Sequence, residues 1–227
     1  MRVKALLIGD ICFQYKYGFY FLYLIFTILY ICLLYALPAA WRERAAILMI
    51  FTDPAAMGLY FMGAIVLFEK SERVLDSIAI SPVKPLEYVI SKLISIALIS
   101  TAVGLLIGFG SGAAANPFFF AVGVFLGSCM FSAVGLMIAL TIATLNQFIV
   151  ATIPGELLIS VPAVVWFFGW KPGFMILHPG VCVIELCRNG GSALPAAFIL
   201  ICWIIVFTLL TCRMAARKLQ SLGGVKL

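Results

Sequence analysis

Few side chains in this 227-residue sequence could do chemistry, and none forms a known catalytic or metal-binding pattern. The single histidine, His178, excludes a Cys/His zinc site, and the seven cysteines include no CxxC pair. There is no HExxH motif and no convincing Ser/His pair, which argues against an enzyme. There is also no GxxxxGK[ST] loop to cradle nucleotide phosphates. We therefore expect no catalytic residue, metal or cofactor on this chain.

Three ionisable residues draw attention because of their neighbours. Glu156 lies in "ATIPGELLISVP", inside an apolar run where a carboxylate costs about 2.5–3.5 kcal/mol. We expect Pro154 to break the helix there, so Glu156 is a candidate for a substrate cavity, with a hydrogen bond between helices as the alternative. His178 is a candidate for an outer gate or an ordinary turn residue. Asp53, before a proline, is expected to cap a helix.

The cysteines favour packing over chemistry. Most are expected to be small apolar packing residues. Cys182 and Cys187 could also pair outside a membrane, although five residues apart on a helix they would point in different directions.

A densely charged stretch runs from Phe68 to Leu93 between two apolar runs. Ser71 can cap a helix there, and Ser81-Pro82 would stop it. Its apolar residues recur at helical spacing on one face and its charged residues lie largely on the other. The apolar face comprises Val74, Leu75, Ile78 and Ala79, and the charged face Glu72, Arg73 and Asp76. We expect an amphipathic helix that docks a partner through Val74, Leu75 and Ile78.

Composition places most of the chain in lipid. It is 65% hydrophobic and 11% charged, against about 45–50% and 25% in soluble domains. We predict an all-α integral membrane protein, one domain over residues 1–227, with six spans of roughly 20 residues. The predicted spans are Phe19–Leu37, Ile47–Phe68, Val89–Phe109, Pro117–Ala143, Phe148–Trp170 and Leu194–Cys212.

Lys and Arg counts predict the orientation, because cytoplasmic loops carry more of them. With the N-terminus inside, the inner segments hold eleven of these residues and the outer segments four. Both termini are therefore expected in the cytoplasm, with the charged stretch. The net charge of +6 is a topology signal, and no nucleic acid partner is expected.

Two further segments are expected outside the spans. Residues 1–18 mix charges with apolar residues, which indicates an interfacial helix or, alternatively, a frayed tail. Residues 171–193 contain an apolar run too short to span. We expect a short re-entrant segment on the outer side, with an ordinary outer loop as the alternative.

Small residues four apart indicate close helix packing around the third and fourth spans. These residues are Gly104, Gly108, Gly112, Gly123 and Gly127.

The charged stretch resembles the coupling segment of type-2 ABC exporter permeases. The shared features are Glu69-Lys70, Leu75-Asp76, Ser81-Pro82 and Lys92. Three earlier stretches resemble permeases for fluoroquinolone export more specifically. They are "YGFY" (17–20), "LPAA" (37–40) and "FTDPAAMGLYF" (51–61). The sequence departs from the family at Arg73-Val74, where Gly-Thr is frequent, and at Asp76, which replaces Glu.

The resemblance implies a mechanism that the residues alone do not give. Two separate ABC ATPase subunits would bind ATP and Mg, and a cleft in each would hold a coupling helix. The expected coupling residues are Glu69, Glu72, Arg73, Val74, Leu75, Asp76, Ile78, Ser81 and Pro82 of segment 69–88. The permease would pair with a second copy or a related permease in a bacterial inner membrane, and export hydrophobic or amphipathic small molecules. The alternative is a transporter or channel not driven by ATP.

Overall fold

The computed structural model describes residues 2–52, 56–114, 116–188 and 191–222. Within these ranges the chain is almost entirely helical and contains no strand. In chain order the elements are α1 (Arg2–Lys16), α2 (Phe19–Ala36), α3 (Ala39–Ile50), α4 (Ala56–Ser71), α5 (Val74–Ala79), α6 (Pro85–Ser111), α7 (Pro117–Thr141), α8 (Leu145–Phe167), the 3-10 helix η2 (Gly173–Leu177), α9 (Pro179–Cys187) and α10 (Ala193–Leu222).

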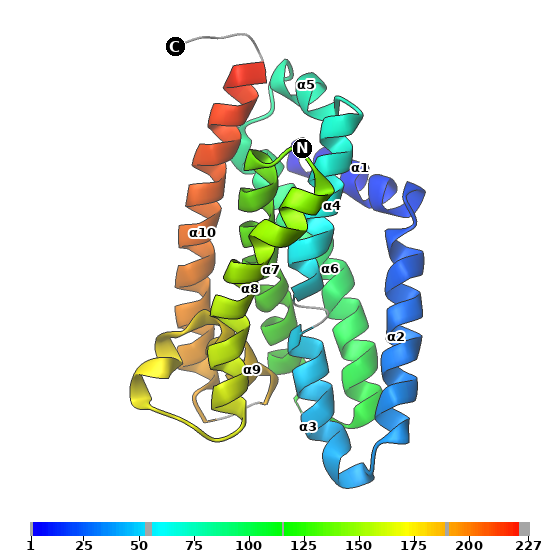
Figure 1. The fold of residues 1–227 in the computed structure, drawn as a ribbon, viewed down its shortest axis with the longest axis vertical. Helices are drawn as coiled ribbons and strands as arrows, with labels where there is room; N and C mark the ends of the chain where they lie inside the picture. Colours follow the sequence, from blue (N-terminus) through cyan, green and yellow to red (C-terminus); the bar gives the residue numbers. More distant parts are fainter. Residues whose placement is uncertain (1, 53–55, 115, 189–190, 223–227) are drawn as a thin grey trace.

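The long helices run side by side along one axis, with α7 at the centre (Figure 1). Helices α4, α6, α9 and α10 all pack against α7. Five helices of the described chain are long and apolar enough to cross a membrane: α2, α6, α7, α8 and α10. The predicted all-helical membrane class is confirmed, and five predicted spans match these helices to within a few residues, apart from the longer C-terminal end of α10.

The second predicted span, Ile47–Phe68, includes residues 53–55, which lie outside the described residues. The region predicted as Ile47–Phe68 is divided between α3 and α4, and neither is among the five long apolar helices. Figure 1 shows α3 near one end of the bundle and α4 continuing toward the other. Asp53, the expected cap, lies outside the described residues.

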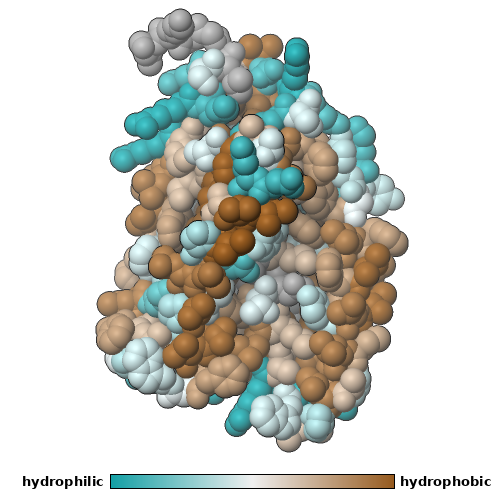
Figure 2. All heavy atoms as spheres, in the orientation of Figure 1, coloured by the Kyte–Doolittle hydropathy of each residue, from teal (hydrophilic) through white to brown (hydrophobic). Residues whose placement is uncertain are grey.

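The two ends of the bundle differ. Helices α1 and α5 and the end of α10 lie together at one end, which we call the α5 end (Figure 1). The α2–α3 connection, η2 and α9 lie at the opposite end, which we call the α9 end. Figure 2 shows hydrophilic side chains gathered toward both ends of the visible face and a mainly hydrophobic flank between them.

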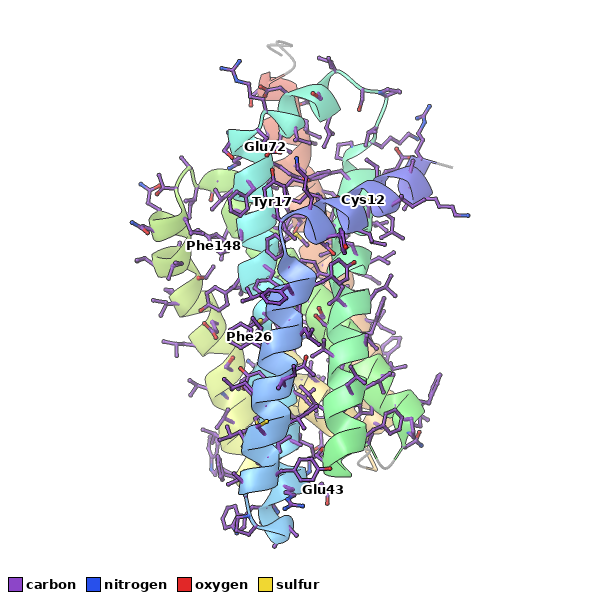
Figure 3. All side chains as sticks on the ribbon, turned by 90° about the vertical axis from the view of Figure 1, so that its right-hand side faces the viewer. Cys12, Tyr17, Phe26, Glu43, Glu72 and Phe148 are labelled. Atoms are coloured by element: carbon purple, nitrogen blue, oxygen red, sulfur yellow. The ribbon has the colours of Figure 1, made fainter. Side chains whose placement is uncertain are left out.

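Helix α1 occupies Arg2–Lys16, within the segment expected to be an interfacial helix, and it lies across the bundle rather than along it (Figure 3). Its most buried residues are polar, Asp10 and Gln14. Apolar Ile8 and Tyr15 are exposed. Helix α1 therefore turns polar groups inward, and its attachment to the bundle depends on polar partners there.

Glycines allow the closest helix contacts. The expected α6–α7 contact exists, because a Cβ on Gly104 would lie 2.9 Å from Val124 and one on Gly108 would lie 2.7 Å from Phe120. Two glycines that the sequence analysis did not single out bring α4 still closer to α7. A Cβ on Gly135 would overlap the backbone oxygen of Leu59, and one on Gly58 would lie 2.6 Å from Ser132 Oγ.

The segment expected on the outer side, residues 171–193, forms η2 and α9. Every residue of α9 is buried, between α7, α8 and α10. The thiols of Cys182 and Cys187 are both free and buried, so the structure does not support a disulfide between them. They pack inside the molecule, as expected of most of the cysteines.

Candidate coupling and substrate sites

Helix α5 is a six-residue helix at the α5 end, shorter than the Ser71–Ile80 helix expected from the sequence. Ser71 does not cap it. Ser71 is the last residue of α4, and its Oγ donates to the Phe68 oxygen at 2.8 Å. The chain reverses at Arg73, which has a positive φ of 57° before α5 begins at Val74. This left-handed conformation favours glycine over other residues.

The apolar side of α5 faces its own chain. Leu75 is only 2% exposed and packs in a core cluster with Tyr88 and Ala215. Val74 and Ile78 are half-buried, and Ile78 lies in a small pocket against Ala216 and Leu219 of α10. The expectation that Leu75 meets a partner is therefore wrong, because the bundle already covers it.

The surface of α5 that remains open is mostly polar. Glu72, Arg73, Asp76 and Ser77 are exposed, and Ile80 is 84% exposed. Two hydrogen bonds hold the segment that follows α5. Ser81 Oγ donates to the Ile78 oxygen at 2.7 Å, and the exposed residue Pro82 accepts a 2.8 Å bond from Arg2. Glu72 is visible at this end in Figure 3.

Glu69 does not belong to this open surface, because it is 3% exposed. It forms an ion pair with Lys92 of α6, which is itself 1% exposed. Lys92 also pairs with Asp10 of α1 at 2.5 Å, and Tyr88 donates to Glu69 at 3.0 Å. We call Asp10, Glu69, Tyr88 and Lys92 the ion cluster. It joins α1, α4 and α6.

The ion cluster explains the inverted burial of α1. One turn along α1, Gln14 Nε2 donates to Ser95 Oγ of α6 at 3.0 Å. Charged groups in a low-dielectric interior are retained only when they are paired and hydrogen-bonded. Sequence reasoning missed Asp10, Gln14 and Tyr88. A signal was present in Lys92, a cation near an apolar run that needs a partner.

Glu156 lies on α8, half-buried, and accepts a short hydrogen bond from the hydroxyl of Tyr60 on α4. This contact is a hydrogen bond between helices, the alternative to a role in a substrate cavity. The expected break is absent, because α8 continues through both Pro154 and Pro162. Pro154 removes one backbone N–H, and an isolated gap of this kind is tolerated within a long helix.

His178 lies between η2 and α9, at the α9 end. Its Nε2 is 3.2 Å from the Leu158 oxygen of α8, and a carbonyl can only accept, so Nε2 carries the proton. Its Nδ1 is buried with no hydrogen-bond partner among the described residues. Burial lowers the pKa of His178, and the bond to Leu158 opposes this shift less strongly. The side chain is therefore a neutral link between α8 and the η2–α9 segment.

Long apolar helices, hydrophilic side chains gathered at the α5 end and buried paired charges define a multi-pass membrane protein. Within the described residues no group of three His, Cys, Asp or Glu side chains could hold a metal ion. The sequence matches the Fluoroquinolones export permease protein family over residues 1–220, and the chain belongs to that family.

Two curated relatives carry the same family name. They are the fluoroquinolones export permease proteins of Mycobacterium tuberculosis strains CDC 1551 / Oshkosh and ATCC 25618 / H37Rv. Each is 26% identical to this chain over 195 residues, which covers 71% of this chain and 81% of the relative.

Proposed function

We propose that this chain is the membrane subunit of an ATP-driven exporter and that α5 transmits motion from a separate ATPase subunit. The observation that carries the proposal is that one side of α5 is buried in the bundle and the other is exposed. Leu75 anchors its inner side in the bundle core, while Glu72, Arg73, Asp76 and Ile80 remain exposed. A partner that pushes on the exposed side would move the helices beneath it.

The connections of α5 support this role. It packs against α4 and α10. The preceding residues of α4 include Glu69, which pairs with Lys92 of α6 and through it with Asp10 of α1. Force on α5 therefore has contiguous routes to α1, α4, α6 and α10. ATP and Mg would bind to the ATPase subunits, two per transporter, and not to this chain.

The proposal includes six crossings with both termini in the cytoplasm of a bacterium. Helices α3 and α4 together form the second crossing, and α1 lies at the inner face of the membrane. The α9 end is then the outer side, where His178 is a candidate gate residue. A second copy of this chain, or a related permease, would complete a cavity next to α8, with Glu156 on its wall. The relatives' names suggest drug-like cargo.

The test is a pull-down of the tagged full chain from its own host, followed by measurement of Mg-ATP hydrolysis and identification of the bound subunits. We expect an ATPase subunit to co-purify, and we expect Ile80→Asp to lower its yield about ten-fold. The matched control is Phe174→Asp, which places the same charge on a 70% exposed apolar residue at the α9 end. Unchanged ATPase yield with Ile80→Asp would contradict the coupling role.

A further inference from the structure

A positively charged pocket of about 420 Å³ lies where the ends of α7 and α10 meet, at the α5 end. Its lining combines two cations, two hydroxyl groups and two apolar side chains. The lining residues are Leu140, Thr141, Met214, Arg217, Lys218 and Ser221. Neither coupling nor the Glu156 site uses any of them. A site with this composition matches a ligand that has both an anionic and an apolar part.

A third cation lies beneath this pocket. Lys70, at the end of α4, donates to three carbonyl oxygens at the C-terminal end of α7: Ala139 at 2.6 Å, Leu140 at 3.1 Å and Ile142 at 2.7 Å. These bonds occupy the negative end of the α7 dipole, which would otherwise repel an anion. Lys218 lies close enough to Lys70 for their charges to repel.

The pocket cations have no acidic partner in the part of the chain that the structure describes. The only ion pairs found there are those of Lys92. Three neighbouring positive charges without a counter-ion repel one another, and an anion placed among them relieves that repulsion.

The surroundings favour a lipid over a free anion. Leu210, which is 42% exposed, lies one turn before Met214 and two turns before Arg217 on the same face of α10. An apolar track therefore leads from the charged pocket down the flank of the helix. Figure 2 shows hydrophilic side chains at this end of the molecule above a hydrophobic flank. Basic pockets between helices at a membrane surface are typical sites for anionic head groups.

We propose that this pocket binds the phosphate head group of an anionic phospholipid, with an acyl chain along Leu210. Arg217 and Lys218 contact the phosphate. The hydroxyl groups of Thr141 and Ser221 donate to the Ile138 and Lys218 oxygens, and their own oxygens can accept hydrogen bonds from the head group. Lys70 contributes its charge from below while it remains bonded to α7. The site requires only that the α5 end lie at a membrane surface, so it does not depend on the identity of any ATPase.

The test measures lipid binding to the purified full chain in detergent by native mass spectrometry, with dioleoylphosphatidylglycerol, dioleoylphosphatidylcholine and inorganic phosphate as separate probes. We expect the phosphatidylglycerol to bind in preference to the phosphatidylcholine. Arg217→Gln and Lys218→Gln should each weaken phosphatidylglycerol binding about five-fold, the effect of one charge near a membrane surface.

The matched control is Lys4→Gln, which removes one exposed charge from α1 at the same end. It should leave the binding unchanged. Equal weakening by Lys4→Gln would mean diffuse attraction and overturn the pocket. Displacement of phosphatidylglycerol by an equal concentration of inorganic phosphate would assign the site to a free anion. Equal binding of the two lipids would overturn the proposal altogether.

Discussion

At the scale of single residues, the informative positions are those where the local environment conflicts with the ordinary preference of the side chain. Arg73 has a positive φ, Glu156 is half-buried on an apolar helix, and Nδ1 of His178 is buried without a hydrogen-bond partner in the described part of the chain. The sequence indicated two of the three, because a lone carboxylate and a lone histidine are visible by type. The conformation of Arg73 could not be predicted from residue type, because arginine is common in helices and only the backbone shows the positive φ.

Replacing Arg73 by glycine should stabilise the protein. A non-glycine residue in the left-handed region costs about 1–2 kcal/mol, part of which the extra freedom of glycine in the unfolded chain offsets. We expect a gain of about 0.5–1 kcal/mol in the free energy of unfolding. The measurement is thermal unfolding in detergent, with Arg73→Ala as control, because alanine removes the side chain and keeps the strain. If Arg73→Ala stabilises the protein as much as Arg73→Gly does, backbone strain is not the cause.

Glu156→Gln separates a structural role from cargo selection. Glutamine still accepts the Tyr60 hydrogen bond, so we expect a stability cost of only about 1 kcal/mol. If Glu156 lines the cavity, efflux of a cationic compound should fall while efflux of a matched neutral compound persists. Both are measured at equal expression of the two proteins. Equal effects on the two compounds would leave the hydrogen bond as the role of Glu156.

His178 predicts a loss of stability in acid. Because burial lowers its pKa, the folded protein binds its proton less readily than the unfolded chain does. The contribution of His178 to the free energy of unfolding is fully present above the ordinary pKa of 6.5. It is lost as pH falls through the lower folded-state pKa. Unfolding followed from pH 7.5 to pH 5 should show this decline (about 1.4 kcal/mol per unit of pKa shift). His178→Gln should remove that part of the decline; an unchanged pH profile would contradict it.

At the scale of elements, hydropathy identified the long helices because each of them coincides with one continuous apolar run of the sequence. It missed the start of α3 at Ala39, because Arg42, Glu43 and Arg44 interrupt the apolar run there. It also failed for the inner face of α1. Asp10 and Gln14 look like surface residues in sequence, and their partners Lys92 and Ser95 lie about eighty positions further along the chain.

The ion cluster should be essential for holding α1 against α6. Lys92→Met leaves the carboxylates of Asp10 and Glu69 buried without their cation, which should cost about 3–5 kcal/mol. Denaturant titration of the purified protein measures this loss. Adding Asp10→Leu and Glu69→Leu to Lys92→Met should recover much of it, because an apolar cluster has no unpaired charge. A small loss in the single variant would show that the buried pairs contribute little.

At the scale of the whole molecule, the two ends have different chemistry. The α5 end holds the ion cluster, the α5 surface and the basic pocket at the end of α10. The α9 end holds the covered helix α9 and the His178 link. Charge counts in the sequence predicted this polarity, since the excess of Lys and Arg falls in the segments that gather at the α5 end.

Cysteine labelling can test the orientation. In a cysteine-free background, Ser71→Cys and Ser221→Cys place thiols at exposed positions of the α5 end, and Phe174→Cys places one at the α9 end. A membrane-impermeant maleimide added to intact cells should label only position 174, because positions 71 and 221 are expected in the cytoplasm. Labelling of either of these from outside would reverse or break the topology.

The close glycine contact between α4 and α7 separates a tightly packed central pair of helices from the less enclosed outer helices. Gly135 lies directly against the backbone of Leu59, and Gly58 packs against the short side chains of Ser128 and Ser132, so neither helix can slide without a collision. Helices α2, α8 and α10 are far less enclosed by the rest of the molecule. We therefore expect α4 and α7 to move as one rigid pair during transport, so that force on α5 shifts both together relative to the outer helices. Spin labels on α4 and α7 should keep one fixed separation through the cycle, while labels on α8 should change theirs.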